Sequence, residues 1–250
     1  MSAFEGKVAV VTGAASGLGR ATALGYAREG ADLMLLDIDE AGLEATAEAV
    51  RDLGARSSTE RCDISDAASC RGAIASCVSD LGGVDVLANV AGVVGFHHAR
   101  EVTPEQWNRY LGINLNGPFF LYQAAIETLL ERRGNLVNVA SSAAFVGEAY
   151  LVPYATSKAG LVHMTRSLAM EHMHDEVRIN AIAPGGMTTP MGATVSIPEG
   201  VRGELIGRYT GLRAPSDPEE VADLILYVTS DRARSIHGAC LAIDGGIAAG

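Results

Sequence analysis

The chain has 250 residues and a formal net charge of −11, with 48% hydrophobic and 20% charged residues. This composition supports a large hydrophobic core and excludes intrinsic disorder. Nucleic acid is disfavoured as a partner, because a negatively charged surface repels a phosphate backbone. The sequence shows neither a leader pattern in its first seven residues nor an apolar run of about 18 residues, so we expect a cytoplasmic protein with no membrane partner.

The first half of the chain alternates short apolar runs with longer amphipathic segments. The apolar runs predict strands, and the segments between them predict helices, two of which end at a glycine, Gly30 or Gly54. The predicted strands cover residues 7–12, 32–37, 58–62 and 84–90, and the predicted helices cover 18–29, 40–53 and 67–80.

The second half continues the same alternation. A long helical stretch is predicted over 104–132, with a break near Gly117-Pro118 because proline lacks the backbone N–H. Further strands are predicted at 135–140, 177–183 and 239–243, and further helices at 153–172 and 218–229.

Apolar strands separated by helices indicate a parallel sheet with helices on both faces. Because such crossovers are right-handed, we predict an α/β fold with a doubly wound, Rossmann-type sheet of about seven strands. No linker or repeat divides residues 1–250, which predicts a single dinucleotide-binding domain. The least regular segment, residues 185–213, is interpreted as a substrate lid.

A glycine-rich turn, Thr12-Gly13-Ala14-Ala15-Ser16-Gly17-Leu18-Gly19, lies between the first predicted strand and helix. Glycines allow a tight bend and a close backbone approach, and a helix N-terminus offers free N–H groups to a diphosphate. Although glycine also serves ordinary turns, the position of this one at the first strand–helix junction favours nucleotide binding.

Asp37 ends the second strand, eighteen residues after Gly19. A carboxylate there can bind the adenosine ribose hydroxyls and would repel a 2′-phosphate. Neither Ile38 nor Ser16 supplies a positive charge, which favours NAD over NADP. The alternative is that Asp37 only caps the next helix.

Tyr154 and Lys158 lie four residues apart in a predicted helix and therefore share one face. A nearby ammonium favours the phenolate, so this pair can act as a general acid and base. Only two of the nineteen basic residues are lysine, Lys7 and Lys158, which suggests that this position needs a compact ammonium. Taken alone, the spacing also arises by chance on helix surfaces.

Together these features resemble the short-chain dehydrogenase/reductase family in its form of about 250 residues, over essentially the whole chain. Further family motifs follow in order: Asn89-Val-Ala-Gly92, with Val90 replacing a second asparagine, then Asn114, Asn138-Val-Ala-Ser141, Pro184-Gly185, Thr189-Pro-Met191 and Asp244-Gly-Gly246.

The resemblance implies a catalytic set of Asn114, Ser141, Tyr154 and Lys158, acting in hydride transfer between NAD and a secondary alcohol or ketone. Ser141 is chosen over Ser142 because it lies thirteen residues before Tyr154. The implied cofactor-binding residues are Gly13, Ser16, Gly17, Leu18, Gly19, Asp37, Asp63, Ile64, Asn89, Ala91, Gly92, Tyr154, Lys158, Pro184, Gly185, Met187 and Thr189. Asp63 could instead cap the helix that begins near Asp66.

The resemblance also implies a small-molecule substrate and a homotetramer. Candidate pocket walls suggest an apolar substrate; they are Val94, Phe145, Tyr150, Val152, Met187, Met191 and Ile197. No metal site is expected, because the histidine pairs lack a third ligand at a suitable spacing. Two alternatives stay open: an NADPH-dependent carbonyl or 3-oxoacyl reductase of the same fold, and a non-catalytic nucleotide-sensing protein.

Overall fold

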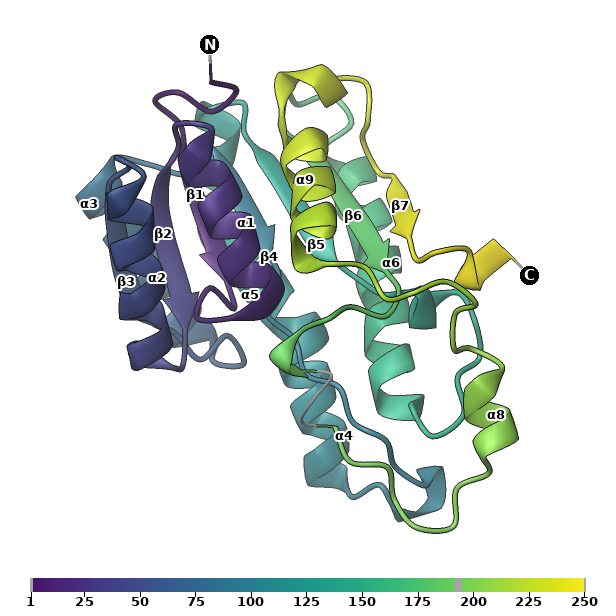
Figure 1. Cartoon of the computed structure of the whole chain (residues 1–250). Helices are drawn as coiled ribbons and strands as arrows, with labels where there is room; N and C mark the ends of the chain where they lie inside the picture. Colours follow the sequence, from purple (N-terminus) through teal and green to yellow (C-terminus); the bar gives the residue numbers. More distant parts are fainter. Residues whose placement is uncertain (1, 192–194, 250) are drawn as a thin grey trace.

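The protein is described by a computed structural model covering residues 2–191 and 195–249. Its centre is a sheet of seven parallel strands in the order β3-β2-β1-β4-β5-β6-β7 (Figure 1). The chain proceeds outward from β1 to β3, returns to β4 beside β1, and then proceeds to β7. This reversal is the switch point of a doubly wound fold and confirms the predicted α/β architecture.

The strands lie close to their predicted positions. Those in the middle of the sheet are apolar along their length because helices cover both faces. The strands are β1 Val8–Thr12, β2 Asp32–Asp37, β3 Ser57–Arg61, β4 Val86–Asn89, β5 Asn135–Val139, β6 Arg178–Pro184 and β7 Cys240–Ile243.

Each face of the sheet has its own hydrophobic core. Helices α1 (Gly17–Arg28), α2 (Glu40–Asp52) and α9 (Pro218–Thr229) pack on one face. Helices α3 (Ala67–Leu81), α5 (Gly117–Glu131) and α6 (Val152–Glu171) pack on the other. Short 3₁₀ turns occur at Ala99–Glu101, Ser142–Ala144, Asp231–Ala233 and Ile247–Ala249. Within the described ranges, no helix combines the length and apolar character needed to cross a membrane.

The long predicted helix over 104–132 has its irregularity slightly earlier than expected. Helix α4 (Pro104–Leu111) passes through a π-helical turn, Gly112–Asn116, directly into α5. Because Pro118 cannot donate to the carbonyl four residues earlier, the α-helical bonding pattern is lost just before the proline rather than at it. The π-helical turn contains Asn114.

The described part of the segment 185–213 includes a short helix, α8 (Gly203–Gly207), which was not predicted. Hydrogen bonds join its described part to the loops after β4 and before α6: the Tyr209 hydroxyl donates to Ala149 O (2.6 Å), Arg202 N donates to the Tyr150 hydroxyl (2.9 Å), and His98 Nε2 lies 2.8 Å from Glu199 O. The segment therefore covers the loop that leads into α6 (Figure 1).

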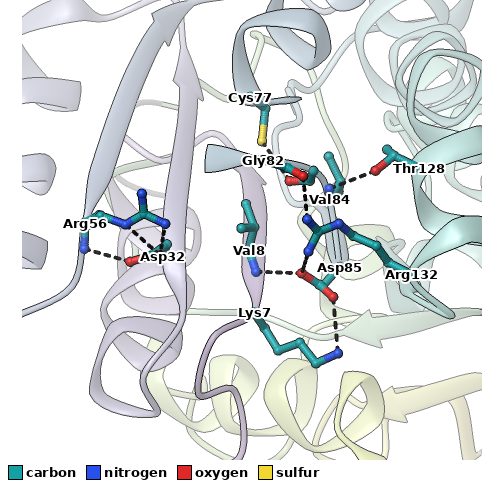
Figure 2. A network of polar contacts seen from close by, with 11 residues as sticks. Lys7, Val8, Asp32, Arg56, Cys77, Gly82, Val84, Asp85, Thr128 and Arg132 are labelled. Atoms are coloured by element: carbon teal, nitrogen blue, oxygen red, sulfur yellow. Dashed lines mark hydrogen bonds and ion pairs between the residues drawn. The ribbon is translucent and has the colours of Figure 1, made fainter. Parts of the chain in front are cut away.

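A compact ionic network lies at the amino end of the sheet (Figure 2). The Asp85 carboxylate, only 4% exposed, accepts hydrogen bonds from Lys7 Nζ (3.2 Å), Val8 N (2.9 Å) and Arg132 Nη1 (3.0 Å). Arg132 also donates to Gly82 O. These contacts join the starts of β1 and β4 to the end of α5, at the edge of the sheet opposite to the strands' carboxyl ends.

Candidate active site

A cleft of about 600 Å³ lies at the carboxyl ends of the strands. It gathers most of the residues that the sequence singles out, from the first loop of the chain to the segment after β6. Those lining it are Gly13, Ser16, Gly17, Leu18, Gly19, Asp37, Asp63, Ile64, Ala91, Gly92, Ser141, Tyr154, Lys158, Pro184, Gly185, Met187 and Thr189.

The glycine-rich turn needs its glycines for geometric reasons. Gly13 and Gly17 have φ values of +69° and +50°, a region that favours glycine. A Cβ on Gly19 would lie 2.0 Å from the carbonyl oxygen of Gly13, which no side chain permits. The turn therefore presents bare backbone and the N-terminus of α1 to the cleft, as a diphosphate site requires.

Asp37 and Asp63, which follow the ends of β2 and β3, line the cleft. The aspartates that cap the next helices are Asp39 and Asp66. Asp39 accepts from Gly42 N at the start of α2, and Asp66 caps α3. Asp37 instead accepts a hydrogen bond from Ala15 N (3.1 Å) in the glycine-rich turn. Asp37 and Asp63 are therefore not the N-caps of α2 and α3, in contrast to the alternative roles considered for them from the sequence.

Tyr154 and Lys158 lie on the first turns of α6, beside the end of β5. Lys158 is 4% exposed, and its Nζ donates to Val139 O (2.7 Å) and lies 5.9 Å from the centroid of the Tyr154 ring. Ser141 is hydrogen-bonded to the Tyr154 side chain and lines the cleft. Ser142 is also buried but is not among the lining residues, which supports the choice of Ser141.

The electrostatics of this pair differ from the expectation based on sequence. Burial raises the pKa of Tyr154 to about 12, an effect that the Ser141 hydrogen bond partly offsets and the Glu148 charge increases. Burial also lowers the pKa of Lys158 to about 8. Burial is the largest cause of the Tyr154 shift and the Lys158 ammonium is not among its causes, so the pKa lowering expected from the four-residue spacing does not appear.

Two predicted residues do not line the cleft. Asn89 is buried, and its Nδ2 donates to Asn138 Oδ1 (2.8 Å), so its side chain joins β4 to β5. Asn114 is also buried: its Oδ1 accepts from Val93 N (2.8 Å), and its Nδ2 donates to Ser157 Oγ (3.0 Å). Asn114 is thus a residue behind the cleft wall, and Asn89 is a link between strands.

Asn114 nevertheless lies close to the lysine. A Cβ on Gly92 would lie 3.2 Å from Asn114 Oδ1 and 3.4 Å from Lys158 Nζ. The bare glycine that follows β4 therefore leaves both polar groups bordering the same small space.

Other residues also line the cleft and were not predicted from the sequence. Most continue a predicted strand end, as Cys62 and Val90 do, and could have been found by extending each motif by one residue. Arg109 was missed for a different reason: it lies on α4, which no family motif marked, and Ile113 lies about one turn later, in the π-helical turn directly before Asn114. The other lining residues that were not predicted are Leu36, Ile38, Ser65, Val93, Val139, Ala140 and Pro190.

The substrate-wall candidates and the loop histidines are dispersed. Met187 and Met191 line the main cleft, and Val94 lines a side pocket of about 180 Å³. Phe145, Val152 and Ile197 are exposed. His97 Nε2 lies 2.9 Å from the Tyr110 hydroxyl, and His98 is held by Glu199 O.

Comparisons with known proteins place this arrangement in a family. A family model described as enoyl-(acyl carrier protein) reductase matches residues 13–248. D-threitol dehydrogenase of Mycolicibacterium smegmatis is 38% identical over 247 residues, covering 97% of this chain and 93% of the relative. A 3-oxoacyl-[acyl-carrier-protein] reductase of Thermotoga maritima is 34% identical, covering 98% of each chain.

Solved structures agree with these matches. A short chain dehydrogenase from Mycobacterium paratuberculosis bound to NAD superposes with a TM-score of 0.91 at 26% identity, covering 99% of each chain. A 3-ketoacyl-(acyl-carrier-protein) reductase from Brucella melitensis complexed with NADH gives 0.88 at 30% identity, covering 98% of this chain and 99% of that one. This chain is therefore an oxidoreductase that belongs to the short-chain dehydrogenase/reductase family.

Proposed function

We propose that the protein is an NAD-dependent dehydrogenase that interconverts a secondary alcohol and a ketone. The observation that carries this proposal is the position of Tyr154, Lys158 and Ser141 in the same cleft as the glycine-rich turn. A general acid and base beside a dinucleotide site is the arrangement that hydride transfer to or from a carbinol carbon needs.

The cleft suits a nicotinamide dinucleotide. The bare backbone of the turn at Gly13, Gly17 and Gly19 would hold the diphosphate, and Asp37 at the end of β2 would bind the adenosine ribose. Asp37 would repel a 2′-phosphate, and its neighbour Ile38 supplies no cation, which supports NAD. When bound, the cofactor supplies the hydride acceptor or donor.

The side chains of the chain then divide the remaining work. Tyr154 takes the hydroxyl proton during alcohol oxidation and returns it during ketone reduction. Ser141 donates a hydrogen bond to the reacting oxygen as charge develops there. Once the cofactor is in place, Lys158 would bind the nicotinamide ribose and stabilise the phenolate, and Asn114 would hold a water molecule that connects Lys158 to solvent.

Two other functions are compatible with parts of this site. Reduction of carbonyl or 3-oxoacyl compounds with NADPH fits the fold and is the type of reaction named for the Thermotoga maritima relative; Asp37 argues against NADPH. A non-catalytic nucleotide sensor fits the cleft as well. A sensor would not require the buried Lys158 beside Tyr154 and Ser141, so the catalytic assignment is preferred.

We further propose that residues 185–213 act as a substrate lid on the single domain, and that the protein is a cytoplasmic homotetramer. The hydrogen bonds from Arg202 and Tyr209 to the loop before α6 support the lid. The tetramer rests on the family alone and is checked by light scattering of the purified protein.

The direct test of the function is a panel of secondary alcohols, each assayed with NAD and with NADP. We expect NAD-dependent oxidation of at least one alcohol, with kcat/KM for NAD well above that for NADP. Preference for NADP would reject the cofactor assignment, and the absence of oxidation or ketone reduction with either cofactor would reject the enzyme assignment.

A further inference from the structure

A buried serine outside the predicted catalytic set joins α6 to the π-helical turn. Ser157 lies on α6 between Tyr154 and Lys158 and is 0% exposed. Its hydroxyl donates to Tyr154 O (2.6 Å) and accepts from Asn114 Nδ2 (3.0 Å). One buried hydroxyl therefore connects the backbone of the proposed acid and base to the asparagine behind the cleft wall.

Hydrogen bonds to Val93 and Ser157 fix the orientation of the Asn114 carboxamide. Its Nδ2 donates to Val93 O (2.9 Å) and to Ser157 Oγ, and its Oδ1 accepts from Val93 N (2.8 Å). Because the Ser157 hydroxyl gives its single proton to Tyr154 O, it can accept from the carboxamide but cannot donate to it. A reversed carboxamide would place donor against donor and acceptor against acceptor, so these bonds would be lost.

The bond to Ser157 is the one of this group that ties Asn114 to α6. The bonds to Val93 hold the carboxamide to the loop after β4, whereas Ser157 belongs to the helix that carries Lys158. Asn114 Oδ1 and Lys158 Nζ border the same space beside Gly92, where a Cβ would lie 3.2 Å and 3.4 Å from them. The Ser157 hydroxyl therefore gives Asn114 a direct link to the helix whose lysine it faces.

We propose that Ser157 is a positioning residue, which holds Asn114 where proton transfer between Lys158 and a water molecule requires it. This inference rests on the proposed function, in which Asn114 holds that water. A carbonyl oxygen suits this role, because it accepts a proton of the water and leaves the lone pairs of the water to Lys158. Ser157 is not among the residues that line the cleft, so it acts through Asn114 and not on the substrate.

A second buried hydroxyl on α6 provides a matched control. Serine and threonine side chains often bond to the carbonyl of the preceding helical turn, which by itself serves only structure. Thr165, about two turns after Ser157, is 1% exposed; its Oγ1 donates to Leu161 O (2.8 Å) and accepts from Asn138 Nδ2 (2.9 Å). Neither Thr165 nor Asn138 lines the cleft, so a change at Thr165 measures the loss of a comparable hydroxyl away from the reacting groups.

The experiment compares Ser157→Ala with Thr165→Val, each alone and each combined with Asn114→Ala. Every variant is assayed with NAD and the best alcohol of the panel for kcat, KM and the solvent deuterium isotope effect on kcat. NAD affinity, measured by fluorescence, and chemical denaturation verify that each variant is folded. Ser157→Cys, which replaces the hydroxyl with a weaker acceptor, is the second variant and carries the same expectations if the alanine variant does not fold.

We expect Ser157→Ala to lower kcat by roughly 10-fold and to change KM and NAD affinity by less than about threefold. The solvent isotope effect should increase, because proton transfer becomes slower. In the Asn114→Ala background the same change should lower kcat by less than about twofold, since the residue through which Ser157 acts is gone. Thr165→Val should change kcat by less than about twofold in either background and leave the isotope effect unchanged.

A kcat loss of the same size with and without Asn114, or an unchanged kcat or isotope effect in the folded Ser157 variant, would leave Ser157 a structural role only. The proposed dehydrogenase function would stand in each of these cases. A wild type that oxidises no alcohol with either cofactor would overturn both the function and the role of Ser157.

Discussion

The two lysines of the chain lie at opposite ends of the sheet and in opposite electrostatic settings. Lys7, at the amino end, is 46% exposed at its side chain and paired with Asp85 (Figure 2). Lys158, at the carboxyl end, is 4% exposed and bonded to a carbonyl, and no acid within the described ranges neutralises it.

This difference indicates a structural role for Lys7 and a functional role for Lys158. At the amino end, a buried carboxylate is satisfied by two cations and a backbone N–H, so each charge has a partner. At the carboxyl end, burial lowers the pKa of Lys158 to about 8, and its ammonium remains available to whatever enters the cleft. Perturbed, unpaired groups of this kind are typical of functional sites.

The largest effect is expected at the carboxyl end. Tyr154→Phe removes the hydroxyl that exchanges a proton with the substrate in the proposed mechanism, so turnover should fall by roughly a thousand-fold or more. NAD affinity should change by less than about threefold, because the ring itself is retained. Steady-state rates and a cofactor titration check both parts, and a near-normal kcat would remove Tyr154 from the mechanism.

The next effect concerns cofactor choice. Asp37→Ser combined with Ile38→Arg replaces a repulsive carboxylate with a cation at the end of β2. The ratio of kcat/KM for NADP to that for NAD should rise by about 100-fold. The single change Ile38→Ala serves as the control and should leave the ratio unchanged. An unchanged ratio in the double variant would show that Asp37 does not discriminate between the cofactors.

A smaller effect, on stability alone, is expected at the amino end. Asp85→Asn leaves Lys7 and Arg132 without their shared anion and should lower the free energy of unfolding by about 2 kcal/mol. Lys7→Met should cost less than about 1 kcal/mol, since Lys7 is half exposed. Chemical denaturation measures both, with kcat/KM expected to stay at the wild-type value. Loss of activity at full stability would contradict the structural role of this network.

The smallest effect is the pH dependence of stability contributed by Lys158. Its pKa is 10.5 when unperturbed and about 8 when folded, so the unfolded chain binds more protons above pH 8. Stability contributed by this group therefore rises with pH. The unfolding free energy of the wild type relative to Lys158→Met should increase by roughly 1–2 kcal/mol between about pH 8 and pH 9.5. If the difference in unfolding free energy between the two proteins does not change with pH, Lys158 is better solvated than its burial indicates.

The fold was predictable because its signals are local. Apolar strands, glycine-terminated helices and the turn at Gly13 specify a parallel doubly wound sheet without knowledge of distant contacts. The lining residues at strand ends follow from the same pattern, since parallel strands end at one edge of the sheet.

Other features depend on contacts between distant segments. The link between Asn89 and Asn138 and the position of Asn114 behind the cleft wall arise from packing between elements far apart in the sequence. The raised pKa of Tyr154 arises from burial by several segments, which the four-residue spacing to Lys158 does not reveal. Ser157 lies within the same four-residue spacing, and only the structure brings its hydroxyl to Asn114.

The most direct test makes the same substitution at each of the two lysines. Lys158→Met and Lys7→Met are compared with the wild type for NAD reduction by the best alcohol of the panel, followed at the NADH absorbance band. We predict that Lys158→Met loses almost all turnover while remaining folded, and that Lys7→Met keeps wild-type turnover. Normal turnover in a folded Lys158→Met protein would contradict the claim that the unpaired lysine serves chemistry.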